Sequence, residues 1–197
     1  MPFITRELIR KRSEHNEGII NTLEEISLHQ EELESISPIL GQSCKKLKII
    51  YLQNNIILKM ENLNYFKDLI YLNLALNNVT KIEGLQNCEF LNKLDLTLNF
   101  IDFDTFKHSI EHLSILYNLK ELYMIGNPCQ SNWSDTNETD ENVTDEGVKG
   151  DDKYRAYIIS KLPQLKVLDG VEITRSAQIL AKQRLPSLEV RYTQSSV

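Results

Sequence analysis

Cysteine, proline and glycine are all scarce in this chain of 197 residues, which contains three, five and seven of them. The cysteines, Cys44, Cys88 and Cys129, are odd in number and widely spaced, which disfavours a disulfide framework and favours reduced structural thiols. With so little glycine and proline, some other residue type must shape the turns.

Long hydrophobic runs are also missing from the sequence. No stretch of about 18 apolar residues occurs, so we expect no transmembrane helix. The first residues, MPFITRELIRKRSEHNE, reach charge at Arg6 without an apolar segment, so we expect no secretory signal and a cytoplasmic protein. Hydrophobic residues at 41% and charged residues at 25% are typical of a soluble domain, and the length suits one continuous core.

A repeated leucine pattern dominates what the sequence does contain. The segments LEEISLHQEEL, LKIIYLQNNII, LIYLNLALNNV, LNKLDLTLNFI and LKELYMIGNPC begin at Leu23, Leu47, Leu69, Leu91 and Leu119, in steps of 24, 22, 22 and 28 residues. Their shared template, L-x-x-L-x-L-x-x-N-x-L, is that of a leucine-rich repeat at the short end of its length range. We therefore predict an α/β leucine-rich-repeat solenoid of five coils, with turns or 3₁₀ pieces on the convex side.

The residue types of the template follow from stacking. The leucines point inward, and because one coil cannot bury them, neighbouring coils must stack into a continuous core. At the bend after each strand, side-chain amides can satisfy backbone groups and form an asparagine ladder, which predicts this role for Asn55, Asn77, Asn99 and Asn127. Glu31 takes this position in the first repeat, which predicts an edge coil open to water.

Both ends of a solenoid need caps, because an uncovered end leaves apolar side chains in water. We predict an N-terminal helical cap over residues 1–22, with Thr5 as its N-cap and apolar residues at helix-compatible intervals from Ile4 to Ile20. The repeats occupy 23–129, with one convex helix around Phe103–Leu113. A C-terminal cap over 153–170 is predicted as a helix and a strand that ends at Asp169 and Gly170, and 171–197 is a partly helical tail.

An acidic insertion interrupts the C-terminal part of the chain. Residues 130–152 hold eight acidic residues and one lysine, a composition that predicts a disordered segment. A tolerated insertion is the favoured interpretation, and an acidic docking segment is the alternative.

The template also predicts where a binding surface would lie. Its third, fifth and seventh positions point away from the core and line the concave side of the sheet. Tyrosines and isoleucines occur there among polar residues, as in a protein-binding patch. The predicted binding residues are Glu25, Ser27, His29, Ile49, Tyr51, Gln53, Tyr71, Asn73, Ala75, Lys93, Asp95, Thr97, Glu121, Tyr123 and Ile125.

Motifs for catalysis are weak. No glycine-rich phosphate loop, nucleophile elbow or C-x-x-C pair is present. The stretch HSIEH, residues 108–112, matches an inverted zinc-protease signature, but it falls on the convex side without a third ligand in a helical context. RELIRKR is interpreted as a solvated helix face. We predict a monomer that is not an enzyme, binds no metal, cofactor, nucleic acid or membrane, and acts through protein partners.

The chain closely resembles the tilB (seahorse) family of leucine-rich-repeat axonemal dynein assembly factors, from about Ile4 to Gly170. The specific matches are EHN followed by LEEISLHQ, then NLALNN, DLTLNFI, LKELYMIGNPC and LPQLKVLDG. The resemblance implies a non-enzymatic adaptor that helps to preassemble dynein arms in the cytoplasm of ciliated or flagellated cells, with localisation extending to the cilium, flagellum or basal body.

The same resemblance implies which partners to expect: other assembly factors, chaperone machinery and dynein chains. It does not extend to the coiled-coil and CS-like regions that the family typically carries, so a chaperone-recruiting role of those regions is not assigned to these residues. The alternatives are other leucine-rich-repeat scaffolds, a phosphatase regulatory subunit or the U2 small-nuclear-ribonucleoprotein subunit.

Overall fold

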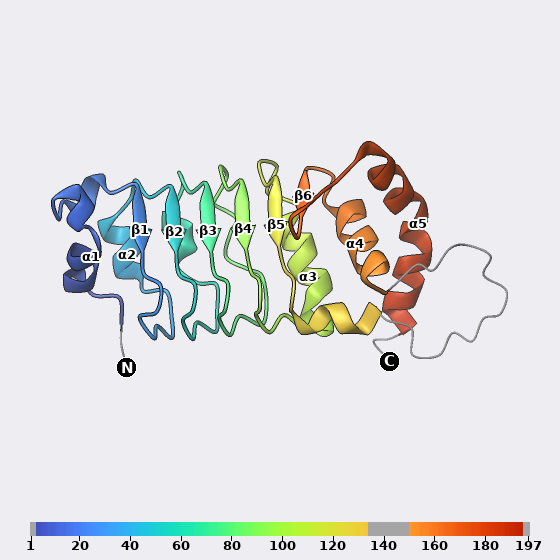
Figure 1. Ribbon diagram of the computed structural model, residues 1–197, viewed down its shortest axis with the longest axis horizontal. Helices are drawn as coiled ribbons and strands as arrows, with labels where there is room; N and C mark the ends of the chain where they lie inside the picture. The colour runs from blue at the N-terminus through green and yellow to red at the C-terminus, as the bar shows by residue number, and fades with distance from the viewer. Residues whose placement is uncertain (1–2, 134–149, 195–197) are drawn as a thin grey trace.

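A single seven-stranded sheet forms the middle of the molecule, with helices at both ends, in the computed structural model, which describes residues 3–133 and 150–194 (Figure 1). The strand order follows the sequence; the first six strands are parallel and the last is antiparallel. The strands are β1 (Glu25–Ser27), β2 (Ile49–Tyr51), β3 (Tyr71–Asn73), β4 (Lys93–Asp95), β5 (Glu121–Tyr123), β6 (Val167–Leu168) and β7 (Val171–Glu172). This architecture confirms the leucine-rich-repeat solenoid, and β6 adds a sixth parallel strand to the five predicted coils.

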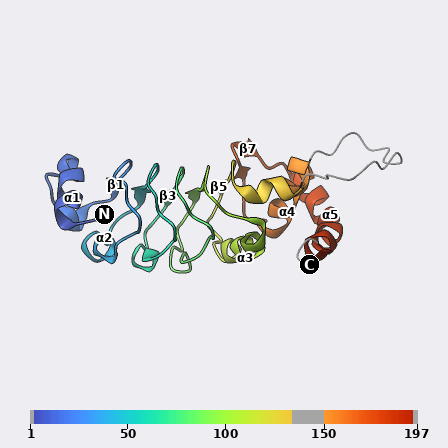
Figure 2. The same cartoon turned by 90° about the horizontal axis from the view of Figure 1, so that it is seen from below.

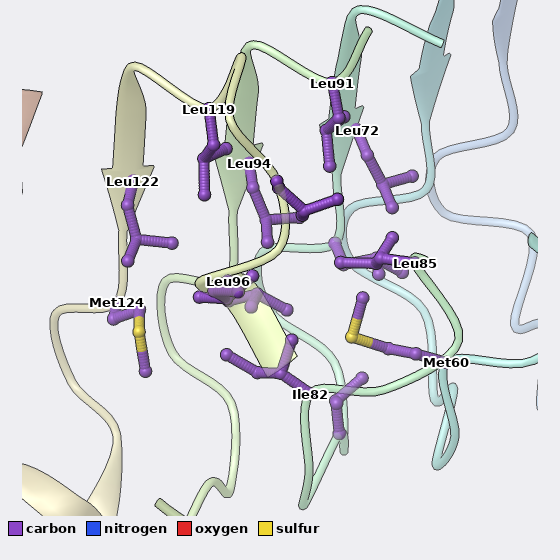
Figure 3. Packing of buried hydrophobic residues seen from close by; sticks show 14 of the residues in the cluster. Met60, Leu72, Ile82, Leu85, Leu91, Leu94, Leu96, Leu119, Leu122 and Met124 are labelled. Atoms are coloured by element: carbon purple, nitrogen blue, oxygen red, sulfur yellow. The ribbon is translucent and has the colours of Figure 1, made fainter. Parts of the chain in front are cut away.

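The core is built from equivalent leucines of successive coils. Leu72, Leu94 and Leu122 are central residues of β3, β4 and β5; each is 0% exposed, and the strand register pairs them. Figure 3 shows these side chains directed toward Met60 and Ile82 from the other side of the coils. Each such side chain stabilises the fold by about 1.5 to 3 kcal/mol through burial.

The asparagine ladder is confirmed, and Asn77 illustrates it. Its side chain is 2% exposed, its Oδ1 accepts the Ile57 N–H at 3.0 Å, and its Nδ2 donates to the Leu52 and Leu74 carbonyls at 2.9 and 3.1 Å. Asn99 repeats this arrangement one coil further along. The ladder thus supplies backbone hydrogen bonds at bends where the chain has no glycine or proline.

The N-terminal cap consists of α1 (Arg6–Arg12) and the 3₁₀ helices η1 (Glu14–Asn16) and η2 (Ile20–Thr22). Thr5 is the N-cap, as predicted, because its Oγ1 accepts the Leu8 N–H at 3.1 Å. The helical pattern expected to continue to Ile19 does not do so: α1 ends at Arg12, and Ile19 is 49% exposed. The helical period is broken before it, where Glu17 and Gly18 adopt positive φ angles of 55° and 71°.

The expectation that Glu31 lies on an open edge is also wrong. Its carboxylate is 21% exposed and accepts from Arg12 of α1, with the Arg12 Nε at 2.6 Å. The N-terminal cap therefore covers this position, and a charge pair replaces the asparagine of the other coils.

The side of the coils opposite the sheet carries short helices (Figure 2). They are α2 (Pro38–Ser43), η3 (Leu63–Tyr65) and α3 (Phe103–Leu113). The convex helix predicted at Phe103–Leu113 is confirmed, and Asp102 caps it by accepting the Thr105 N–H at 2.8 Å. No helix among the described residues is both long and apolar enough to span a membrane.

The boundaries of the predicted disordered insertion are corrected at both ends. Its first residues belong to the 3₁₀ helix η4 (Pro128–Trp133), and its last belong to α4 (Gly150–Lys161). Trp133 is 1% exposed, with ring centroids 5.9 Å from Phe103 and 6.1 Å from Phe106. Burial of an aromatic ring outweighs the polar composition around it. Residues 134–149 of the insertion lie outside the described residues.

The C-terminal end closes as a cap and extends further than predicted. Helix α4 packs against α3 and η4, and the 20-residue helix α5 (Arg175–Gln194) packs along α4 (Figure 1). Asp169 and Gly170 form the predicted turn with φ angles of 51° and 77°, which brings β7 back along β6. Ala181 and Leu188 of α5 are buried, so most of the predicted tail is a packed helix.

All three cysteines are free and buried. Burial raises the thiol pKa to about 11 for Cys44 and about 12 for Cys88 and Cys129. At neutral pH these thiols are protonated and pack as small apolar side chains, as the sequence predicts.

Candidate protein-binding face

The strand side chains that point away from the core form two rows across the sheet. The parallel register places Glu25, Ile49, Tyr71, Lys93 and Glu121 in one row. The same register places Ser27, Tyr51, Asn73, Asp95 and Tyr123 in the other row. We call these two rows the sheet face. Glu25 is exposed and the other nine residues are half-buried.

The five remaining predicted residues lie beyond the strand ends. Each strand of β1 to β5 has only three residues, so the seventh template position falls outside it. His29, Gln53, Ala75, Thr97 and Ile125 therefore form a third row at the edge of the sheet face.

Aromatic rings and a lysine occupy the middle of the sheet face. The rings of Tyr51 and Tyr71 meet edge to face with centroids 5.6 Å apart. The Lys93 Nζ lies 5.2 Å from the centroid of Tyr71 and 4.9 Å from that of Tyr123, so one ammonium contacts two rings. Although the prediction included these residues individually, it missed the contact between them.

The positive charge of Lys93 is largely neutralised by a carboxylate of the same sheet face. Its Nζ lies 3.1 Å from the Glu121 Oε2, which also accepts the Tyr123 hydroxyl at 3.3 Å. Burial opposes the charged form of Lys93, but the hydrogen bond and charge of Glu121 outweigh it, so the pKa of Lys93 is raised. Burial, and then the charge of Asp95, raises the pKa of Tyr71. The Tyr71 hydroxyl is therefore a neutral hydrogen-bonding group at physiological pH.

Short polar side chains organise the end of each strand. The Asn73 Oδ1 accepts the Ala75 N–H, and the Asp95 Oδ1 accepts the Thr97 N–H, both at 3.0 Å. Asp169 continues this row beyond β6 and accepts from the Met124 N–H at 2.6 Å. These contacts fix the backbone so that the rings of the sheet face are held by a rigid support.

One residue of the sheet face was missed by sequence reasoning. Val167 of β6 pairs with Glu121 and extends the first row by one position. The signal was the repeat-like LPQLKVLDG: in a repeat that begins at Leu165, Val167 is the third position, but the prediction treated this segment only as a cap.

The HSIEH motif serves a structural role. The His112 Nε2 accepts the Leu85 N–H at 3.0 Å, so the lone pair that would bind zinc is already used. His108 points to solvent with its side chain 72% exposed, and its nearest acid is Glu111 at 3.5 Å. Within residues 3–133 and 150–194, no group of three or more His, Cys, Asp or Glu side chains is arranged to hold a metal ion.

The hydrogen bond of His112 predicts a pH dependence of stability. Burial lowers the pKa of His112, with Glu83 opposing and Lys81 adding to this effect. The pKa of His112 in the folded state lies below the unfolded value of about 6.5. Its contribution to the free energy of unfolding is therefore present above about pH 6.5 and is lost as the pH falls toward the pKa of the folded state. We expect the free energy of unfolding, measured with urea, to fall less between pH 7.5 and pH 5.5 for His112→Gln than for wild type. Glutamine keeps a hydrogen-bond acceptor but does not titrate.

His108→Gln is the matched control for this experiment, because the same substitution is made at an exposed residue of the same helix. We expect it to keep the wild-type pH dependence. An equal pH dependence in wild type and His112→Gln would show that His112 does not contribute to it.

The stacked parallel coils, the buried asparagine ladder and the capped ends define a leucine-rich-repeat protein. The same fold occurs in a chain of the Drosophila melanogaster SNF/U2A′ complex, which matches over its whole length and that of this chain with a TM-score of 0.74 and 22% identity. A Listeria monocytogenes internalin matches 76% of this chain and 35% of its own chain, with a TM-score of 0.53 and 18% identity. At these identities the likeness concerns the fold. No family model matches the chain.

Sequence comparison identifies one family within the leucine-rich-repeat proteins. It is 46% identical to dynein axonemal assembly factor 11 of Mus musculus over 94% of its length, 48% identical to protein tilB of Drosophila melanogaster over 94%, and 40% identical to dynein axonemal assembly factor 11 of Trypanosoma brucei brucei over 98%. The chain belongs to this tilB family of dynein axonemal assembly factors. It spans 34%, 41% and 45% of the lengths of these three relatives.

Proposed function

We propose that this chain is a non-enzymatic adaptor in the cytoplasmic preassembly of axonemal dynein arms, and that it binds a partner protein through the sheet face. The observation that carries the proposal is its identity of 40 to 48% to three dynein axonemal assembly factors over at least 94% of its length. We expect the partner protein to be another assembly factor, a component of the chaperone machinery or a dynein chain.

The composition of the sheet face supports a protein partner. Tyr51, Tyr71 and Tyr123 offer large rings with a polar tip, and a ring loses little conformational freedom when it is bound. Lys93 lies between the rings of Tyr71 and Tyr123. Such a surface favours a partner segment that combines apolar contact with hydrogen bonds.

Loss of the protein in ciliated or flagellated cells that express it tests the assembly function. We expect electron microscopy of axonemes to show missing dynein arms, restored by the wild-type protein. Intact arms in cells without the protein would refute the proposal.

The triple variant Tyr51→Ala, Tyr71→Ala and Tyr123→Ala tests the role of the sheet face. Because these rings are half-buried on the surface, we expect the variant to fold and to reach wild-type levels without restoring the arms. Loss of several interface aromatics of this kind lowers affinity by about 100-fold or more. Full restoration by a folded variant would place the binding surface elsewhere.

A further inference from the structure

Four exposed apolar side chains lie together where strands β3 to β5 end. Leu76, Leu98, Phe100 and Ile125 are 48%, 50%, 55% and 54% exposed, and we call them the edge patch. The Leu76 N–H donates to the Thr97 carbonyl and the Leu98 N–H donates to the Ile125 carbonyl, so the patch follows the stacked coils. Clustered apolar exposure of this kind marks an interaction surface more often than scattered single residues do.

The backbone at the edge patch is one that leucine disfavours. Leu76 and Leu98 have φ angles of 55° and 54°, in the left-handed region. The neighbouring coils place Asn54 and Gly126 at the same template position, and these residue types accept that region readily. A leucine is strained in this region and gains little burial at these two positions, so fold stability does not explain it.

Gly126 makes room for one of these leucines. A Cβ atom at Gly126 would lie 2.5 Å from the Leu98 Cδ2, so a larger residue there would displace the Leu98 side chain. Leu98 therefore lies against Gly126 of the next coil, and its N–H donates to the Ile125 carbonyl.

A surface groove of about 740 Å³ adjoins the patch, and its lining includes Leu98, Phe100, Ile125 and Pro128. The polar side chains of its rim are engaged locally. The Gln130 Oε1 accepts the Gly126 N–H at 2.6 Å, and the Ser131 Oγ donates to the Pro128 carbonyl at 2.8 Å. The groove therefore offers mainly apolar contact to an occupant.

Charge on the adjacent sheet face is predominantly negative. Its ten residues include three carboxylates and one ammonium, and that ammonium, Lys93, is paired with Glu121. Asp95 lies next to the patch, since it accepts the Thr97 N–H and the Thr97 carbonyl accepts the Leu76 N–H at 2.8 Å. An occupant of the groove thus meets the Asp95 carboxylate on the side of the sheet.

We propose that the edge patch and its groove bind a basic amphipathic segment of a partner protein, with an aliphatic side chain beside Leu98 and a lysine or arginine facing Asp95. This inference rests on the proposed function and specifies the chemistry of the partner. Burial of the aliphatic group supplies affinity, and the charge pair sets the orientation of the segment.

Panning the whole chain against a phage library of random 16-residue peptides tests the inference. Enriched peptides should combine aliphatic and basic residues, and synthetic copies should bind Leu98→Asp at least about tenfold more weakly, because the apolar contact with Leu98 is lost. Asp95→Asn keeps the acceptor for Thr97 but removes the charge, so it should weaken binding and reduce its salt dependence.

Leu58→Asp is the matched control, because Leu58 is 55% exposed on the second coil and does not line the groove. It should bind the peptides as wild type does. Acidic peptides, an empty selection, or equal binding by folded Leu98→Asp would overturn the inference. Peptides whose binding requires the sheet-face tyrosines but not Leu98 would overturn the inference and leave the proposed function standing. Intact dynein arms in cells without the protein would count against the proposed function alone.

Discussion

Replacing Asn77 by alanine is expected to lower the free energy of unfolding by about 3 kcal/mol. The Leu52 and Leu74 carbonyls keep a second partner, because Asn55 and Asn99 also donate to them. The Ile57 N–H is different: its acceptor is the Asn77 Oδ1, and Ile57 is 0% exposed. The orphaned N–H therefore accounts for most of the loss, and the lost hydrogen bonds of Asn77 add the remainder.

Asn78→Ala is the control for this measurement. Asn78 is the next residue and is half-buried, and its N–H donates to the Ile57 carbonyl through the backbone, which the substitution leaves intact. We expect a change below about 0.5 kcal/mol in chemical denaturation. A loss below about 1 kcal/mol for Asn77→Ala would mean that water replaces the amide and that the ladder is dispensable at this coil.

Replacing Phe106 by alanine is expected to cost about 3 to 5 kcal/mol, because it leaves a cavity between the repeats and the C-terminal cap. The ring of Phe106 lies 5.6 Å from those of both Tyr154 and Tyr157 in α4, and 6.1 Å from that of Trp133. It thus joins α3 to η4 and α4, so its loss weakens the contact that covers the last coil.

Phe100→Ala is the matched variant, because the same ring is removed from a side chain that is 55% exposed. Its stability in thermal and urea unfolding should stay within about 0.5 kcal/mol of wild type. Equal destabilisation by the two substitutions would contradict the cap interface described above.

The sequence was most informative where one residue type repeats in one environment. Leu72 and Leu94 identify the coils, and Asn77 and Asn99 identify the bends, because stacking repeats the same burial at each step. The sheet-face positions follow from the same period. Their role in binding stays a prediction, since the period shows where a side chain points and not what it contacts.

Features that depend on contacts between distant segments were not predictable in this way. Trp133 lies in an acidic stretch, and its burial depends on Phe103, thirty residues earlier in the chain. Glu31 breaks the ladder pattern because Arg12 of the cap reaches it. The edge patch was missed because Leu98 stands at a template position where leucine carries no repeat signal.

The hairpin of β6 and β7 limits how this molecule can change in length. Because β7 runs antiparallel along β6, it occupies the hydrogen-bonding edge to which a further parallel coil would be added. At the other end, α1 covers the first coil and contacts β1. An additional coil could therefore be accommodated only between existing coils, where both of its faces would be covered by neighbouring repeats.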